Sequence, residues 1–262
     1  INGYDMVSDT AFSNDRDGRD NDPADPGDWV DAADLQLQDY KDFKCQEEPS
    51  SWHGTAIAGM LAANSNNGVG VASMNWFAPV LVVRVAAKCG ADAVDIIDGI
   101  RWVAGLPDVC LRSDALGACQ EVAPALPQPR ARIINISFGG DGDCNSSDAP
   151  YQPAIDAARA RGVVIVAAAG NENAAPTRPA KCAGVIGVAA LNRNGLKATY
   201  SNFGPRLTVA TVGGDNHEPG DDRWAQVADS GLRTVSNNGQ TTPGPSSYDN
   251  YFGTSFSTPV VA

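Results

Sequence analysis

The sequence lacks several features that would assign it to common functional classes. No run of eighteen or more apolar residues occurs in its 262 residues, which argues against a membrane-spanning helix. The formal net charge is −12 and no basic cluster is present, so the footprint that nucleic acid requires is missing. None of the six cysteines forms a Cys-x-x-Cys pair, which argues against a zinc ribbon or a thioredoxin-like site.

The six cysteines are even in number and widely spaced, which favours three disulfide bonds in an exported protein. Scattered buried thiols in a cytosolic protein are the alternative. Proximity in the chain favours a bond between Cys110 and Cys119, which would close a Pro-rich surface insertion at 107–131.

Buried strands alternate with helices along the chain. The β-branched runs at 79–87 and 163–169 are typical of strands covered on both faces, and 92–106 has helical spacing with Asp92 near its start. This order predicts an α/β fold of three α/β/α layers with a mostly parallel central sheet. We expect one domain over 1–262, truncated at both ends, whose residues 1–50 form an acidic, loop-rich segment.

Catalytic residues are expected just after the strands, at the carboxyl edge of such a sheet. Only two histidines exist: His217 lies in a polar turn, whereas His53 begins a helix of small residues and suits a general base. Ser255 follows Gly253 and Thr254 at another helix start, with Pro259 expected in the first turn. A serine that only caps its helix is the alternative. Asn171 ends a buried strand, where its amide can donate to an oxyanion.

Four stretches, HGTAIAG, NISFGG, AAAGNEN and FGTSFSTP, resemble in this order the subtilisin-like serine peptidases, or subtilases. The resemblance covers 53–262 and implies a serine endopeptidase with His53 as general base, Ser255 as nucleophile and Asn171 as oxyanion donor. It implies substrate contacts along two walls that hold a peptide by main-chain pairing. The residues concerned are Ser137, Phe138, Gly139, Gly140, Gly90, Ala91, Ala169 and Gly170.

The resemblance is to an exported bacterial branch of the family, and it pairs Cys45 with Cys89 and Cys144 with Cys182. It implies secretion and a protein or peptide substrate. We expect a monomer that binds neither nucleic acid nor membrane.

The family's catalytic aspartate lies in an Asp-Ser/Thr-Gly triplet before the histidine, and no such triplet precedes His53. We expect that this aspartate lies upstream of residue 1 and that the chain alone is weakly active or inactive. A non-catalytic, peptide-binding homologue that has lost the aspartate is the alternative. An unrelated α/β hydrolase would require a Gly-x-Ser-x-Gly motif and a histidine after the serine, and both are absent.

The segment 14–29 carries six aspartates, at a spacing that suits the oxygen ligands of calcium. The predicted ligand set for a structural calcium ion is Asp15, Asp17, Arg19, Asp20 and Asp22. A solvated acidic loop is the alternative.

Overall fold

The computed structural model describes residues 3–114, 118–147, 149–215 and 229–262. His217 therefore lies outside the described residues. The chain divides into two compact units, and each is described here by itself. Unit 1 comprises Ile1–Ala56, Val80–Arg130 and Ser236–Ser247, and unit 2 comprises Ile57–Pro79, Ala131–Val235 and Tyr248–Ala262.

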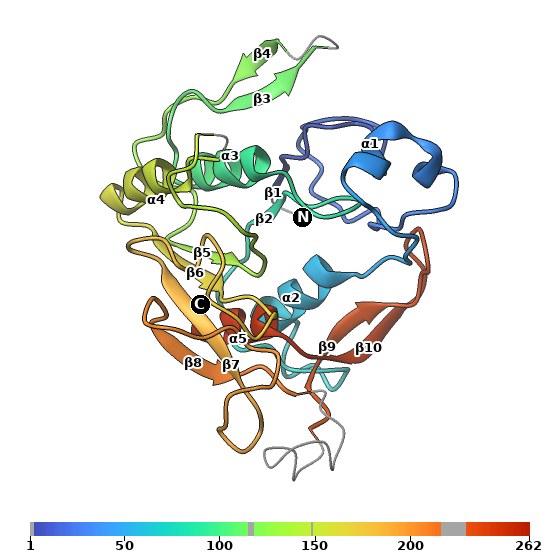
Figure 1. The fold of residues 1–262 in the computed structure, drawn as a ribbon, viewed down its shortest axis with the longest axis vertical. Coiled ribbons are helices and arrows are strands. Elements are labelled where there is room, and N and C mark those ends of the chain that lie inside the picture. Colours follow the sequence, from blue (N-terminus) through green and yellow to red (C-terminus); the bar gives the residue numbers. More distant parts are fainter. Residues whose placement is uncertain (1–2, 115–117, 148, 216–228) are drawn as a thin grey trace. The chain divides into compact units, whose positions relative to one another are not determined.

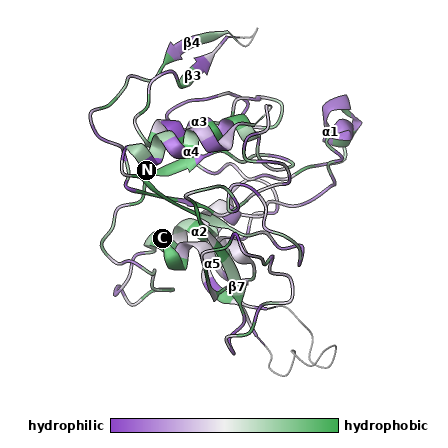
Figure 2. Ribbon diagram, turned by 60° about the vertical axis from the view of Figure 1, so that its left-hand side comes forward, coloured by the Kyte–Doolittle hydropathy of each residue, from purple (hydrophilic) through white to green (hydrophobic). Residues whose placement is uncertain are grey.

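Unit 2 contains a parallel four-stranded sheet in the order β5-β6-β7-β8 (Figure 1). Its strands are β5 (Ile133–Ile136), β6 (Val164–Ala168), β7 (Ile186–Leu191) and β8 (Val209–Val212). Helix α4 (Tyr151–Ala160) packs on β6, and α5 (Thr254–Val261) packs on all four strands. The central strand β7 is apolar, as its green colour in Figure 2 shows, and its four middle residues are buried. The prediction of a mostly parallel sheet between helices is confirmed here.

Unit 1 contains a second parallel pair, β1 (Gly3–Asp5) with β2 (Val82–Arg84). The predicted strand 79–87 is therefore shorter than expected. Helix α3 (Ala93–Val103) begins after Asp92, whose carboxylate accepts a hydrogen bond from Val94 N, as an N-cap should. The 107–131 insertion contains an antiparallel hairpin of β3 (Cys110–Ser113) and β4 (Cys119–Val122).

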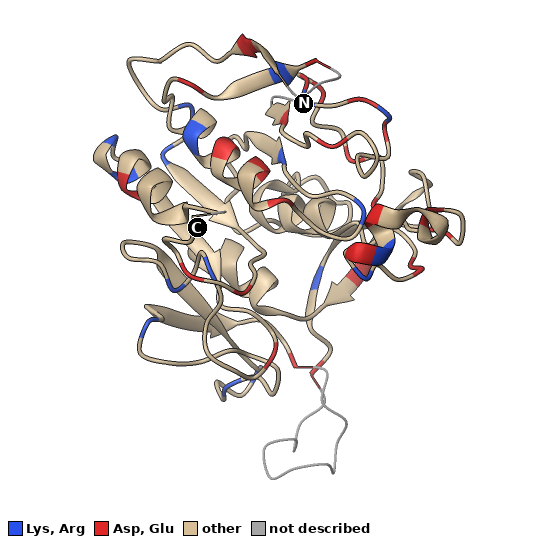
Figure 3. Ribbon diagram, turned by 45° about the horizontal axis from the view of Figure 1, so that its top comes forward, with Lys and Arg blue, Asp and Glu red and all other residues tan. Residues whose placement is uncertain are grey.

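The acidic N-terminal segment is ordered mainly by turns, and its aspartates between residues 9 and 31 lie in loops and turns, as the acidic loops of Figure 3 illustrate. It contains the short 3-10 helix η1 (Asp34–Gln36) and helix α1 (Gln38–Asp42), which is strongly hydrophilic in Figure 2. A small apolar cluster under these loops includes Val7, Val30 and Tyr40. The cluster also contains Ala87, so the segment packs against a residue from outside it.

Three further elements include residues of both units: α2 (His53–Ala62) and the paired strands β9 (Leu232–Asn237) and β10 (Ser246–Tyr251). In the described residues, no helix has both the length and the apolar character needed to cross a bilayer. The expectation of a single domain stays a prediction.

Three disulfide bonds join Cys45 to Cys89, Cys110 to Cys119 and Cys144 to Cys182. These are the pairs named from the sequence, two by resemblance and one by proximity. Each bond joins two cysteines of one unit, and cross-links of this kind stabilise a fold by restricting its unfolded chain.

Candidate active site

Ser255 is the second residue of α5, at the end of the helix that meets the carboxyl edge of the sheet in unit 2. Gly253 is the N-cap, with φ of 138°, a backbone conformation that favours glycine. The side chain of Ser255 is largely buried, and its Oγ donates a 2.7 Å hydrogen bond to the carbonyl of Ser137, directly after β5. The first-turn N–H groups of α5, including that of Ser255, have no acceptor four residues back in the helix. A developing anion at this helix end would therefore be stabilised.

Asn171 reaches the same helix end from the loop after β6. Its Oδ1 accepts hydrogen bonds from Thr254 N at 2.9 Å and Thr254 Oγ1 at 3.0 Å. Because the carbonyl end of the amide caps the helix, the Nδ2 end is the one that can donate to an oxyanion. An added Cβ on Gly253 would lie 3.6 Å from that Nδ2, so the donor lies beside the residue that precedes the nucleophile's helix.

Pro259 is expected in the first turn of its helix, but it lies later in α5. The helix begins at Thr254, which makes Pro259 its sixth residue and not part of the first turn. A proline there cannot donate to the carbonyl four residues back, which belongs to Ser255. Ser137 Oγ donates to that carbonyl instead, at 2.7 Å. The Ser137 hydroxyl thus replaces the hydrogen bond that Pro259 cannot donate to the carbonyl of Ser255.

Replacing Ser137 with alanine should therefore lower the free energy of unfolding by about 1–3 kcal/mol, because the buried carbonyl of Ser255 loses this donor. Urea unfolding of the parent chain and of Ser137→Ala measures the difference. Ser230→Ala, at an exposed serine of the same unit, serves as the matched control and should change stability by less than about 0.5 kcal/mol. Equal stabilities of Ser137→Ala and the parent would contradict this role.

Three further side chains build this end of unit 2, and of these the sequence motif points only to Thr254, at the helix start. Thr254 Oγ1 accepts a hydrogen bond from Gly170 N, and the hydroxyl of Tyr200 accepts one from Gly253 N at 2.9 Å. Burial raises the pKa of Tyr200, so the phenol stays protonated and can also donate to the carbonyls of Gly213 or Gly214. The third is the fully buried Asn202, which accepts from the N–H groups of Glu172 and Ala174 and so holds the loop carrying Asn171.

His53 begins α2 and belongs to unit 1. Burial lowers the pKa of its imidazole from the ordinary value, and the charges of Asp28 and Asp25 oppose that effect. A neutral imidazole near neutral pH is the form that a general base requires. The structure brings Ser255, Asn171, Ser137 and Gly170 together within unit 2. The approach of His53 to Ser255 stays a prediction.

The predicted substrate walls are partly occupied by main-chain pairing within the protein. Gly140 exchanges two 3.0 Å hydrogen bonds with Arg178, and a Cβ on Gly139 would collide with the Arg178 carbonyl. Gly90 pairs its N–H and carbonyl with Ala87 across a tight turn. Ser137 is also engaged, because its carbonyl accepts from Ser255 Oγ and its own Oγ donates to the Ser255 carbonyl. Contact of any of these residues with substrate stays a prediction.

The remaining candidates, Ala169 and Gly170, lie between β6 and Asn171. The carbonyl of Ala169 accepts hydrogen bonds from Thr177 N and from the side chain of Asn202. Gly170 has φ of 105°, and a Cβ there would come within 2.2 Å of Asn202 Nδ2. Glycine is therefore required for the chain to turn from the strand into the loop of Asn171.

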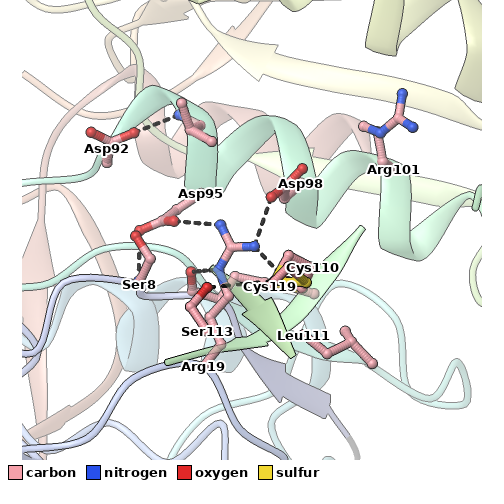
Figure 4. Close-up of polar contacts among 12 residues, drawn as sticks. Ser8, Arg19, Asp92, Asp95, Asp98, Arg101, Cys110, Leu111, Ser113 and Cys119 are labelled. Carbon is pink, nitrogen blue, oxygen red and sulfur yellow. Dashed lines mark hydrogen bonds and ion pairs between the residues drawn. A yellow bond between two sulfur atoms is a disulfide. The ribbon is translucent and has the colours of Figure 1, made fainter. Parts of the chain in front are cut away.

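The predicted calcium ligands have other partners in the structure. The guanidinium of Arg19 is buried against α3, where it binds Asp95 and Asp98 at 2.7 Å each and donates to the Cys110 carbonyl (Figure 4). Asp15 forms an ion pair with Arg84. Among the described residues, no group of three or more His, Cys, Asp or Glu side chains is arranged to hold a metal ion.

Two side chains of the predicted set are thus engaged in ion pairs, Arg19 with Asp95 and Asp98, and Asp15 with Arg84. The carboxylates of Asp17, Asp20 and Asp22 remain as oxygen donors. Calcium binding by this segment stays a prediction.

Comparison with known proteins assigns the chain to a family. The sequence profile of the subtilase family, peptidase family S8, matches residues 7–262. The chain belongs to this family. It is 39% identical over 266 residues to an extracellular protease of Xanthomonas campestris and 36% identical over 267 residues to an extracellular basic protease of Dichelobacter nodosus. Both alignments cover 99% of the chain but only 39% and 38% of those relatives, so the chain spans about two fifths of their length.

The structure is also similar to a solved protease from Pseudoalteromonas arctica, with a TM-score of 0.80 and 39% identity. That match covers 100% of this chain and 69% of the other. The predicted subtilisin-like, three-layer α/β/α fold with a mostly parallel sheet is therefore confirmed.

Proposed function

We propose that the protein is a secreted serine endopeptidase that hydrolyses peptide bonds through an acyl-enzyme on Ser255. His53 accepts the proton of the Ser255 hydroxyl as that oxygen attacks the peptide carbonyl. Asn171 Nδ2 and the Ser255 N–H donate to the resulting oxyanion. The imidazolium then gives its proton to the leaving amine, and water hydrolyses the acyl-enzyme by the same steps in reverse order.

One observation supports this function above the others. Asn171 caps the helix that bears Ser255, so a hydroxyl, a helix N-terminus and an amide donor meet at one sheet edge. Asn171 already accepts a hydrogen bond from the first N–H of the helix. The helix therefore does not need Ser255 as its cap, and the capping alternative does not explain why a serine stands there. Family membership and the protease relatives support the same reaction.

Secretion is also part of the proposal. The relatives named above are described as extracellular, and the three disulfides suit an oxidising compartment. The substrate is proposed to be a protein or peptide held by main-chain pairing. Calcium binding by the acidic segment stays part of the proposal, and calorimetric titration of calcium into the metal-free chain tests it.

The test of the proposed function is covalent labelling of the chain with a serine-directed aryl phosphonate. We expect a single adduct, which peptide mass spectrometry places on Ser255, and no adduct in Ser255→Ala. Labelling at several serines at equal rates would show that Ser255 is not activated. An upstream-extended chain that binds peptides but takes no label would instead be a non-catalytic homologue, the alternative that the missing Asp-Ser/Thr-Gly triplet favours.

A further inference from the structure

Two carboxylates of the acidic segment are tied to the residues directly around His53, all within unit 1. The Ser51 N–H and Oγ donate to the two oxygens of Asp28, each at 2.6 Å. Thr55 Oγ1 donates to Asp25 Oδ2 at 2.8 Å. Ser51 Oγ also accepts a hydrogen bond from the backbone N–H of His53, with 3.3 Å between the oxygen and the nitrogen. The chain is therefore fixed by a carboxylate two residues before His53 and by another two residues after it.

The turn between the two carboxylates is built for close approach. Gly27 has φ of 95°, and its N–H donates to Asp25 Oδ1 at 3.0 Å. A Cβ on Gly27 would come within 2.4 Å of Ser50 Oγ and of the Thr241 carbonyl. Only glycine lets this turn lie against the segment that leads into α2, and this contact brings Asp25 and Asp28 to their positions.

A second part of unit 1, residues 239–241, also holds the residues that lead into α2, and we call it the strap. Trp52 Nε1 donates to the Gly239 carbonyl at 2.7 Å, and Ser50 N donates to the Gln240 carbonyl at 2.8 Å. Neither this strap nor α2 contains an Asp, Glu, Lys or Arg. The charges of Asp28 and Asp25 act on the His53 imidazole, and both favour its protonated form.

We propose that Asp28 and Asp25 are positioning residues for His53, which hold the start of α2 in place and stabilise the imidazolium that forms during catalysis. This inference rests on the proposed function. Loss of solvent disfavours the protonated imidazole, so a negative charge fixed nearby lowers the barrier to the proton transfer from Ser255. The two aspartates act on the histidine and touch neither substrate nor nucleophile in this scheme.

The chain permits a direct test because it contains only two histidines. Ring-proton NMR spectra of the whole chain, recorded from pH 4 to pH 9, give the pKa of each imidazole, and His217→Gln assigns the signals. We expect the pKa of His53 to be lower in Asp28→Asn than in the parent chain, because the substitution removes a charge that raises it and keeps the side chain's size. Asp28→Glu keeps the charge and should hold the pKa near that of the parent.

Asp39→Asn is the matched control, since Asp39 is an exposed aspartate of the same segment, and it should leave the pKa of His53 unchanged. Asp25→Asn should lower it as Asp28→Asn does, which keeps the test available if one variant fails to fold. An unchanged His53 pKa in whichever of these variants folds would overturn the inference. The measurement requires no peptidase activity, so its result is independent of whether the phosphonate labels Ser255.

Discussion

Replacing His53 with alanine should slow phosphonate labelling of Ser255 by about 10²- to 10⁴-fold, the usual contribution of a positioned general base. A serine hydroxyl is a weak nucleophile until a neighbouring base accepts its proton. In this structure Ser255 Oγ donates to the Ser137 carbonyl, and a main-chain carbonyl cannot carry that proton away. The rate therefore depends on the imidazole, and the second-order rate constant of labelling measures it.

The pH dependence adds a signature that a structural role would not produce. Only the neutral imidazole accepts a proton, so labelling should rise with pH through the pKa of His53, which burial lowers from its ordinary value. That step should be absent in His53→Ala. His217→Ala is the matched control, because His217 is the other histidine of the chain, and it should keep both the rate and the step. Labelling of His53→Ala at the parent rate would exclude His53 as the base.

Residue patterns were sufficient to predict the parts of the site that depend on local sequence. A buried strand followed by Gly170 and Asn171 predicts a polar group at the carboxyl edge of a parallel sheet, and Asn171 lies there. Glycine before Thr254 and Ser255 predicts a helix start, and the helix begins at Thr254. These features depend on residues that are neighbours in the sequence, so they can be predicted without knowledge of the rest of the fold.

Contacts between distant segments could not be predicted in the same way. Arg19 lies among aspartates in the sequence, which led to its inclusion in a calcium site, yet its partners Asp95 and Asp98 belong to a helix far along the chain. The hydroxyl of Ser137 meets Ser255 across 118 residues. Spacing shows which side chains are charged or polar, but only the packed strands and helices decide which of them meet.

Asn171 should have two separable roles, because the two ends of its amide do different work. Asn171→Asp keeps the Oδ1 acceptor that caps α5 but replaces the Nδ2 donor with a negatively charged oxygen. We expect a loss in the labelling rate of about 10²- to 10³-fold, a magnitude taken from the corresponding donor in another subtilase. The unfolding free energy should stay near that of the parent, since the hydrogen bonds from Thr254 persist.

Asn171→Ala removes both ends of the amide and should therefore show both losses. Its labelling rate should fall as in Asn171→Asp, and its unfolding free energy should fall by about 0.5–2 kcal/mol, the usual effect of losing a helix cap. Asn194→Asp, at an exposed asparagine of unit 2, is the control for the added charge and should label at the parent rate. If Asn171→Asp labelled as fast as the parent while Asn171→Ala was merely less stable, Asn171 would be a cap alone, and stabilisation of the oxyanion would have to come from the helix N-terminus.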